Sequence, residues 1–469
     1  MSALPGLPEI PLAPTEEGSG FPDTDIANAA RLVHRHGTHI RYTTAAGWTV
    51  WDGKRWIHDE RDVRIQAFAK ETALSIFDEI KNASDRNVII RHAKHSQSKR
   101  SIDNMIALAR SESGICIPLT AFDADPLLLN VANGTLDLRT GELRPHRREN
   151  LITKIVPIAY DANAEAELWD GFLRRITERN EELYRYLRRL VGYLLTGSTT
   201  EQVLHFFFGL GANGKSVFSE IVSSLLGDYA VICSPELIML RRHGGIPNDV
   251  ARLRGARAAL MNETTQGAKF DEAKLKDLTG GDSLTARFLH REYFDFRPTH
   301  KLVIRGNHKP AIVGTDEGIW RRLRLVPFTV SIPPDEQDRH LLEKLRAELP
   351  GILKWAVDGC LEWQRDGLQP PDCVTDAVQE YRTEADTLGR FIEEQCEVRA
   401  FAQVKSAAFF QRFQQYAEQA SERWIPAKDL PGEMRRRGFE QRRTKSGVLY
   451  LGLELIQSEG AHGQIRARV

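Results

Sequence analysis

The sequence predicts a chain of three folded parts: a central α/β domain with a largely parallel sheet, an α+β domain before it and a winged-helix-like domain after it. Three observations lead to this prediction. Between residues 200 and 330, short apolar runs alternate with helical segments and Gly-rich turns, which is typical of α/β domains. Hairpin patterns with tight-turn dipeptides lie upstream. Three helical segments followed by a two-stranded pattern lie near the end of the sequence.

Composition limits the possible functions only weakly. The chain has 469 residues, enough for two or three domains, and its 64 Lys and Arg balance its 64 Asp and Glu. Any charge that serves a nucleic-acid partner must therefore be local. The five cysteines are scattered and form no CxxC pair, which favours a reducing cytoplasm without disulfides or a cysteine zinc site.

No membrane attachment is predicted. The sequence has no run of about 18 apolar residues. Its start is acidic and rich in Pro and Gly, with no basic residues followed by an apolar core. We therefore interpret residues 1–20 as a flexible arm and not as a signal peptide.

Residues 21–164 form the expected N-terminal α+β domain. Helices are predicted over 25–36 and over 62–113, where the basic stretch RHAKHSQSKR lies, and two strands in LLLNVANGTLDLRTGELRPH. Between the helices, IRYTTAAGWTVWDGKRWIHD has the pattern of a hairpin that turns at Asp52-Gly53. The tryptophans of this hairpin either stack on bases or, as the favoured alternative, pack a small sheet.

The rest of the chain divides by a change of pattern. Residues 165–199 carry apolar residues three and four apart and are predicted to form a helical collar or linker. The α/β domain spans 200–335, with strands expected in VLHFFFG, AALMNE, KLVIRGN and RLRLVPF. Residues 336–380 are expected to form a helical lid or linker, which contains a Pro-Pro boundary signal, and 381–469 form the winged-helix-like domain.

The strongest motif is GLGANGKS, Gly209 to Ser216, which has the GxxxxGK[ST] spacing of a loop that binds the phosphates of ATP. An apolar strand precedes it and an amphipathic helix follows, as the motif requires. Glycines let the backbone curl, so that N–H groups and the helix N-terminus surround phosphate charge. Lys215 is expected to reach the β- and γ-phosphates, and Ser216 to hold Mg²⁺. The predicted nucleotide contacts are Gly209, Gly211, Ala212, Asn213, Gly214, Lys215, Ser216 and Val217.

Two polar residues end neighbouring predicted strands. Glu263 ends AALMNE, where a carboxylate can polarise the attacking water and help to hold Mg²⁺; a helix cap or surface position is the alternative. Because Asn262 stands where many ATPases carry Asp, the metal depends more on Ser216 and on water. Asn307 ends KLVIRGN, where its amide can orient water against the γ-phosphate; a turn is the alternative.

The segment GIWRRLRLVPF places Arg321 and Arg322 just before a predicted strand. An arginine supplied across a subunit boundary stabilises charge on a transferring phosphoryl group. Adjacent side chains on a strand point to opposite faces, so only one of the two can serve, and Arg322 is favoured. Surface salt bridging is the alternative.

In this order, GLGANGKS, the stretch from ALMNETTQ to RGNHKP, and GIWRRLRLVPF resemble the superfamily 3 helicase domain of phage and plasmid primase-helicases, related to the poxvirus primase-helicase. The resemblance is tight over about 200–330, and NGTLDLRTGELRPH and WDGKRW extend it upstream. It implies an AAA+-like P-loop ATPase with GLGANGKS as Walker A, Glu263 as Walker B and Asn307 as sensor 1. Gly306 departs from the usual TNHKP of the family. The element peculiar to this superfamily corresponds to LKDLTGGDSLTAR, with Lys276, Asp282 and Arg287.

The resemblance also implies a homo-hexameric ring with ATP sites between subunits, which translocates 3′ to 5′ on single-stranded DNA. The family places a hairpin in the ring channel, here TARFLHREYFDF. Its Phe288 or Tyr293 can stack on bases; a solvated charged hairpin is the alternative. The hairpin residues expected to contact phosphates are Arg287, His290 and Arg291.

Many members of the family carry a primase domain upstream, with clustered acidic residues and often zinc. The residues before the Walker A motif show no convincing metal cluster. His34, His36 and His39 have no cysteine nearby, so a surface or packing role is preferred over zinc. We therefore expect a helicase without primase activity in the same chain, acting with a separate primase or polymerase.

The segment EMRRRGFEQRRTKSG carries six basic residues against Glu433 and Glu440, a local charge of +4 in a neutral chain. Basic residues clustered on a helix end and a wing suit phosphate binding. A solvated basic surface is the alternative. The predicted DNA contacts are Arg435, Arg436, Arg437, Arg442, Arg443 and Lys445.

The favoured function is that of an ATP hydrolase and replicative DNA helicase of a phage, prophage or plasmid, which unwinds forked duplex in the bacterial cytoplasm with ATP and Mg²⁺. The alternative is a DNA-binding replication initiator that uses ATP as an assembly switch, without processive unwinding. A P-loop kinase of small molecules is disfavoured by the LTGGD element, the arginine pair and the basic tail.

Overall fold

The computed structural model describes residues 21–83, 85–240, 248–262, 268–287, 293–312, 317–420, 424–445 and 447–456. The chain forms two compact units. The first comprises Met1–Pro310 and Arg321–Val374, and the second comprises Ala311–Trp320 and Thr375–Val469. In the described ranges, no helix is both long enough and apolar enough to cross a membrane.

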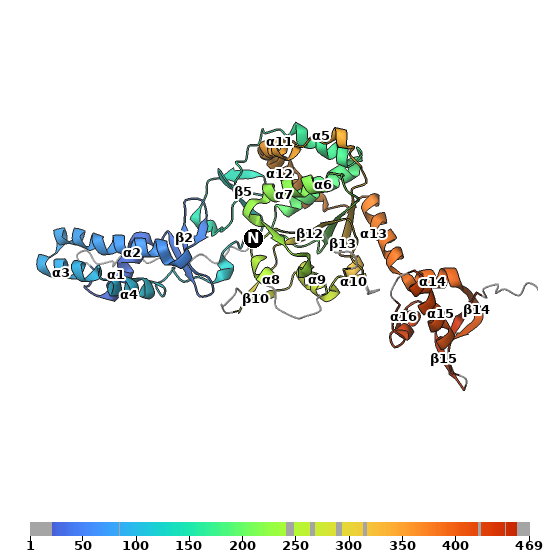
Figure 1. Cartoon of the computed structure of the whole chain (residues 1–469). Coiled ribbons are helices and arrows are strands. Elements are labelled where there is room, and N and C mark those ends of the chain that lie inside the picture. The colour runs from blue at the N-terminus through green and yellow to red at the C-terminus, as the bar shows by residue number, and fades with distance from the viewer. Residues whose placement is uncertain are drawn as a thin grey trace, which may run out of the picture. The chain divides into compact units, whose positions relative to one another are not determined.

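The first unit begins with a helical group and a small antiparallel sheet (Figure 1). Trp48 is buried with Leu32, Ile65 and Met105, and Trp56 is buried in a second small cluster. The packing interpretation of these two tryptophans is confirmed. The helices are α1 Asp25–His36, α2 Val63–Ser75, α3 Arg86–Ser96 and α4 Lys99–Ala109. The strands are β1 Ile40–Thr43, β2 Gly47–Trp51 and β3 Trp56–His58.

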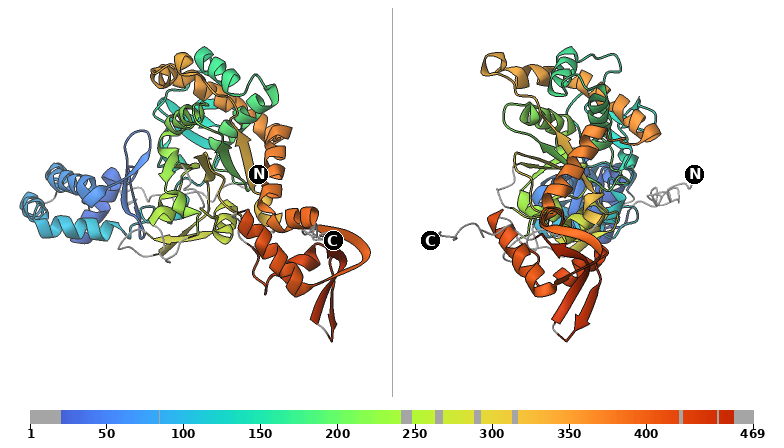
Figure 2. Two further views of the ribbon diagram at one scale, coloured as in Figure 1. Left: turned by 45° about the vertical axis from the view of Figure 1, so that its right-hand side comes forward. Right: turned by 90° about the vertical axis from the view of Figure 1, so that its right-hand side faces the viewer.

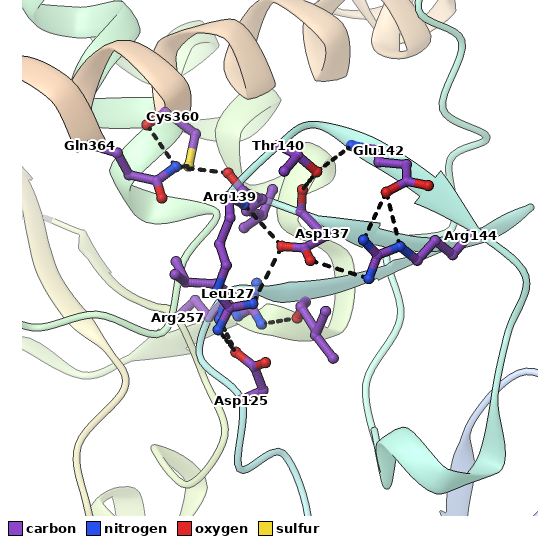
Figure 3. A network of polar contacts seen from close by, with 12 residues as sticks. Asp125, Leu127, Asp137, Arg139, Thr140, Glu142, Arg144, Arg257, Cys360 and Gln364 are labelled. Atoms are coloured by element: carbon purple, nitrogen blue, oxygen red, sulfur yellow. Dashed lines mark hydrogen bonds and ion pairs between the residues drawn. The ribbon is translucent and has the colours of Figure 1, made fainter. Parts of the chain in front are cut away.

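A second antiparallel sheet follows, with strands β4 Leu128–Val131, β5 Gly134–Asp137 and β6 Glu142–Arg144. The prediction of two strands here was wrong by one, because every residue of β6 is exposed and gives no apolar alternation. Figure 3 shows the polar network that joins its strands and neighbouring loop. The guanidinium of Arg139 lies 2.8 Å from a carboxylate oxygen of Asp125 and 3.3 Å from one of Asp137. Arg144 lies 3.3 Å from Asp137, which therefore joins two arginines.

The central sheet has the strand order β13-β7-β12-β9-β8, and all paired strands are parallel. Its four predicted strands are confirmed. The fifth, β8, was not predicted; it lies at the sheet edge with Ile232 57% exposed, so it lacks a continuous apolar pattern. Parallel pairing brings the carboxyl ends of β7, β9 and β12 to one edge. The strands are β7 Leu204–Phe208, β8 Ala230–Cys233, β9 Ala258–Asn262, β12 Lys301–Gly306 and β13 Leu323–Pro327.

Helices α6, α7 and α12 lie together beside this sheet (Figures 1 and 2) and share one apolar core with it. The backbones of α6 and α12 touch: a Cβ added to Gly192 would stand 2.1 Å from the Cys360 nitrogen. A Cβ on Gly359 would stand 2.2 Å from the Arg188 carbonyl oxygen. Only glycine permits this approach. The helices are α5 Glu167–Ile176, α6 Glu181–Leu194, α7 Lys215–Leu226, α11 Leu341–Ala347 and α12 Leu349–Asp366.

Two buried cations close the carboxyl end of α6. Arg257 donates to the Leu195 carbonyl and, at 2.5 Å, to the Leu128 carbonyl, and it lies 4.3 Å over the Tyr229 ring. Lys301 donates to the Thr196 carbonyl, and burial lowers the pKa of its ammonium well below its usual range. Cations at a helix carboxyl end satisfy carbonyls that lack an intrahelical partner. These contacts tie α6 to the strands β9 and β12.

The second unit contains a three-stranded antiparallel sheet of order β14-β16-β15 around an apolar core with Phe391, Phe409 and Tyr450. Strand β14 was not predicted, because it is mostly exposed and its pairing register shifts between Val398 and Gln403. The helices are α10 Glu317–Trp320, α13 Asp372–Ala385, α14 Thr387–Gln395, α15 Ser406–Gln419 and α16 Leu430–Arg436. The strands are β14 Cys396–Lys405, β15 Gln441–Thr444 and β16 Gly447–Leu455.

Candidate nucleotide site

The loop between β7 and α7 carries the GLGANGKS motif and is held closely against β13. A Cβ on Gly209 would stand 2.2 Å from the Phe328 carbonyl oxygen, so only glycine allows this approach. The buried Asn213 amide donates to the same carbonyl at 3.0 Å. Gly214 adopts φ +82°, a left-handed conformation that favours glycine, and α7 begins directly after it. The motif therefore forms a tight turn whose N–H groups lead into a helix N-terminus.

Lys215 and Asn307 meet at this loop, as the sequence led us to expect. The Lys215 ammonium donates to the Gly209 carbonyl at 2.5 Å, to the Leu210 carbonyl at 3.3 Å and to the Asn307 amide oxygen at 3.2 Å. Lys215 is 6% exposed. Because β7 and β12 are paired and parallel, the loop after one and the residue after the other converge at the same sheet edge.

A cavity of about 790 Å³ opens over this loop. Its size falls within the range of sites that bind nucleotide-sized ligands. Residues of the loop, of the ends of β9 and β12, of α5 and of the segment before α11 surround it. The lining residues are Leu168, Gly171, Phe172, Arg175, Gly211, Ala212, Asn213, Gly214, Lys215, Ser216, Val217, Asn262, Arg305, Gly306, Asn307, Ile332, Glu336, Gln337, Asp338 and Leu341.

The cavity contains charged residues that the sequence reasoning missed. Arg305 donates to the Ser216 carbonyl at 3.2 Å and lies 3.4 Å from the Glu220 carboxylate. Arg175 of α5 forms an ion pair with Glu336. Arg305 could have been predicted, because a charged residue directly after the apolar residues LVI of a buried strand indicates a functional role. Arg175 gave no such signal, because its position depends on how α5 packs.

Several predicted residues lie elsewhere. Glu263, Phe288, His290 and Arg291 lie outside the described residues, whereas Asn262 is exposed at the end of β9 and lines the cavity. Lys276 lies on α9 (Glu272–Thr279), Asp282 is exposed in the turn after it, and Arg287 ends β10 (Leu284–Arg287). The Arg287 guanidinium lies 5.2 Å from the ring centre of its cross-strand partner Tyr293, which begins β11 (Tyr293–Phe296).

The arginine pair stands apart from the cavity lining. Arg321 is exposed and Arg322 is half-buried just before β13, and the Arg322 carbonyl accepts a hydrogen bond from Leu204 at 2.7 Å. Neither side chain contributes to the walls of the cavity of its own subunit.

The basic tail residues differ in their surroundings. Arg437 lies 2.5 Å from Asp386, which also caps α14, and 3.2 Å from Glu433. Arg436 lies 2.6 Å from Glu433. These ion pairs hold α16 against the start of α14, so Arg437 already has a local structural partner. The exposed members of the predicted set are Arg435, Arg436, Arg442, Arg443 and Lys445.

Of the three histidines considered for zinc, His36 stacks on the Phe68 ring at 4.5 Å between ring centres. His34 lies 5.9 Å from the Phe21 ring. Among the residues that the structure describes, no three His, Cys, Asp or Glu side chains gather as a metal site. A packing role fits the observed contacts of His34 and His36.

The sequence is similar to two protein families and to several viral proteins. The sequence matches the family described as D5 N terminal like over residues 29–178, and a family of unknown function, DUF5906, over residues 207–322. "Putative helicase L207/L206" of Acanthamoeba polyphaga mimivirus is 28% identical over 297 residues, covering 58% of this chain and 31% of that protein. "Putative helicase 022R" of Frog virus 3 is 30% identical over 358 residues, covering 58% and 36%. The chain thus spans about a third of the length of these relatives.

A solved structure, the apo form of the NrS-1 C terminal region, covers 88% of this chain and 96% of its own. The identity is 8% and the TM-score 0.45, a likeness too weak to bear on function. "Putative primase C962R" of African swine fever virus is 29% identical over 219 residues. The chain thus matches the D5 N terminal like and DUF5906 families in succession and is distantly similar to viral proteins described as putative helicases and primases.

Proposed function

We propose that this chain is an ATP-driven DNA helicase. The observation that supports it best is the convergence of the Lys215 ammonium and the Asn307 amide, 3.2 Å apart, on a glycine turn at the floor of one cavity. A cation, a polar amide and helix N–H groups at one point suit a triphosphate and its attacking water. In this proposal Lys215 binds the β- and γ-phosphates, and Asn307 orients the water.

The same cavity suits Mg²⁺. Mg²⁺ keeps several waters and binds through one or two protein oxygens together with substrate phosphates. The Ser216 side chain is exposed at the cavity wall, and Asn262 lines the cavity from the end of β9. We assign Ser216 to the metal and Glu263 to activation of water, with a share in holding the metal. When bound, Mg²⁺ neutralises charge on the phosphates.

We further propose that the active form is a homo-hexameric ring in which Arg322, or else Arg321, reaches the cavity of the next subunit. The position of this pair outside its own cavity supports the proposal. The test is to mix Lys215→Ala with Arg322→Ala protein. Random assembly would recreate up to about a quarter of complete interfaces, and hydrolysis returns in the mixture if the site is shared. If each variant is inactive alone and ATP hydrolysis does not return in mixed complexes, Arg322 does not belong to a site shared between subunits.

DNA contacts are proposed at two places in addition to the channel residues His290 and Arg291. The hairpin of β10 and β11 offers Arg287 and Tyr293, a cation and a half-exposed ring, to a single strand. From α14 on, the second unit has the order helix, strand, helix, helix, strand, strand with the last strand in the middle of the sheet, and this order supports our proposal of a winged-helix-like DNA-binding domain. Its α16 end and β15–β16 wing carry the exposed members of the basic set.

Translocation from 3′ to 5′ on single-stranded DNA and a phage, prophage or plasmid origin in a bacterial cytoplasm are part of the same proposal. A separate primase or polymerase is the proposed partner at the fork. These rest on the family resemblance.

The first test is ATP hydrolysis with and without single-stranded DNA, using native protein, Lys215→Ala and Asn307→Ala. We expect stimulation by DNA in the native protein and a loss of at least about 100-fold for either variant, as for removal of one preorganised catalytic group. Full hydrolysis by Lys215→Ala would contradict the assignment of the site.

An ATP-switched initiator is the second candidate function, and the basic surface of the second unit favours it. An initiator keeps nucleotide binding at Lys215 and duplex binding by the basic tail. It differs from a helicase in one measurable way: its hydrolysis does not respond to single strands.

A further inference from the structure

The helix pair α3–α4 carries a concentrated positive charge that the proposed function does not use. Residues 86–100 contain five Lys or Arg and no Asp or Glu, in a chain whose formal net charge is zero. All five side chains are exposed. The surface, called the α3–α4 cationic face below, consists of Arg86, Arg91, Lys94, Lys99 and Arg100.

The charges of this face are not used by the fold. None of the ion pairs found among the described residues includes any of the five. The carboxylates nearest in sequence are Asp85 and Asp103, and Asp85 accepts the Asn87 N–H at 2.9 Å as the cap of α3. Glu79, in the preceding 3-10 segment, lies 2.7 Å from the nearly buried Arg31. Glu79 is therefore engaged elsewhere, and neither Asp85 nor Asp103 forms an ion pair with the face among the described residues.

Helix stability does not explain these charges either. Lys99 and Arg100 occupy the first turn of α4, where the helix dipole disfavours cations by roughly 0.3–1 kcal/mol each. The cap residue Ser98 accepts the Ser101 N–H at 3.2 Å, so the turn is stabilised without them. Two cations at an unfavourable position, with no carboxylate partner, indicate an anionic partner from outside.

Both helices are fixed by their other faces. In α4, Ile102, Met105 and Ile106 are buried in the core with Leu32 and Trp48. In α3, the ring of the buried His92 lies 3.0 Å from the Asn28 amide oxygen and 3.3 Å from the Ser96 hydroxyl. The exposed cations therefore lie on α3 and α4, which Figure 1 labels, and the other faces of these helices are buried.

We propose that the α3–α4 cationic face binds the phosphate backbone of duplex DNA without reading its sequence. This inference rests on the proposed function for the identity of the polyanion. Residues 86–100 contain no Phe, Tyr or Trp on which bases of a single strand could stack, which favours duplex over single strands. The one exposed aliphatic side chain of the face, Val88, is 41% exposed, too little apolar surface to enter a membrane or anchor a protein interface. With 11 residues, α3 extends about 16 Å, the length of roughly five base pairs.

The test compares two double variants of the full chain, each removing one Lys and one Arg. Lys94→Gln/Arg100→Gln removes two cations of the face, and Lys354→Gln/Arg365→Gln removes two surface cations that are paired with Asp358 and Asp366. Binding to two duplexes of unrelated sequence is measured as a function of salt concentration.

The expected result follows from counterion release. Each lost phosphate contact reduces the slope of log K against log salt by about 0.9 and, at 0.1 M salt, weakens binding about eightfold. Lys94→Gln/Arg100→Gln should therefore lower the slope by roughly 1–2 and weaken binding about 10- to 60-fold, equally for both duplexes. The control double variant should bind like the native protein. Equal slopes and affinities for the two double variants would overturn the proposal.

A second double variant, a vesicle-binding assay and an unwinding assay separate the remaining interpretations. If Lys94→Gln/Arg100→Gln melts below the control, Arg91→Gln/Lys99→Gln replaces it, with the same expected slope and the same overturning result. Loss of binding to vesicles containing phosphatidylserine, with duplex binding intact, would also overturn the proposal. If native protein fails to unwind a fork but the face variant still loses duplex affinity, the helicase proposal fails and this inference stands. If native protein unwinds a fork and both double variants bind duplex equally, this inference fails and the helicase proposal stands.

Discussion

Gly214→Ala tests whether the proposed phosphate-binding turn is shaped by helix α5, which packs against it. The added Cβ would stand 2.5 Å from Ile176 Cγ2 and within 3.3 Å of two Phe172 ring atoms, and Ile176 is buried. Overpacking of this kind costs about 1–3 kcal/mol, and the left-handed φ of +82° adds roughly 1–2 kcal/mol for a residue with a Cβ. We expect a total loss of about 2–5 kcal/mol of unfolding free energy.

The assay is thermal unfolding followed by circular dichroism, with Gly211→Ala as the matched control from the same turn. A Cβ on Gly211 meets nothing within 4 Å. At about 2–4 °C per kcal/mol for a domain of this size, Gly214→Ala should melt roughly 4–20 °C lower, and the control within a few degrees of native protein. Saturating ATP and Mg²⁺ should raise the melting temperature of native protein but not that of Gly214→Ala. Equal melting temperatures for the two variants would refute the packing argument.

Three further predictions concern hydrolysis and stability. Lys215→Met should lower ATP turnover at least about 100-fold. The melting temperature should change by only a few degrees, because water in the cavity can replace the Lys215 ammonium as the partner of the Gly209, Leu210 and Asn307 oxygens. Retained ATP turnover would contradict this prediction. Burial lowers the pKa of His205 to about 3 and of His300 to about 4, so below pH 6.5 the unfolded chain binds protons that the folded chain does not. Urea unfolding should show stability falling by up to about 1.4 kcal/mol per pH unit for each histidine between pH 6.5 and 4, and a flat profile would exclude it. Gly192→Ala would bring a Cβ to 2.1 Å from the α12 backbone and should unfold at a lower temperature than Gly171→Ala, which meets nothing within 4 Å; equal melting would disprove the close helix contact.

The parts of the fold that could be predicted are those with a strong local pattern. Strands β7, β9, β12 and β13 are short buried apolar runs, and the turn from Gly209 to Ser216 follows from residue spacing alone. The meeting of Lys215 with Asn307 was predictable because parallel strands end at one edge of a sheet. Local sequence patterns were therefore enough to predict the candidate nucleotide site.

The parts that could not be predicted depend on tertiary contacts or exposed edges. Strands β6, β8 and β14 have exposed residues and no continuous apolar period, so they resemble loops. Arg175 reaches the cavity only because α5 packs beside the loop, and Arg437 is held by Asp386, 51 positions away in the sequence. Such long-range pairs leave no signal in residue spacing.

Strand displacement tests the central claim most directly. Native protein and Lys215→Ala are incubated with ATP, Mg²⁺ and a forked duplex carrying either a 3′ or a 5′ single-stranded tail. The account predicts that native protein unwinds the 3′-tailed fork and that Lys215→Ala unwinds neither. If native protein hydrolyses ATP and binds duplex but displaces no strand from either fork, the helicase account is contradicted and the initiator reading replaces it.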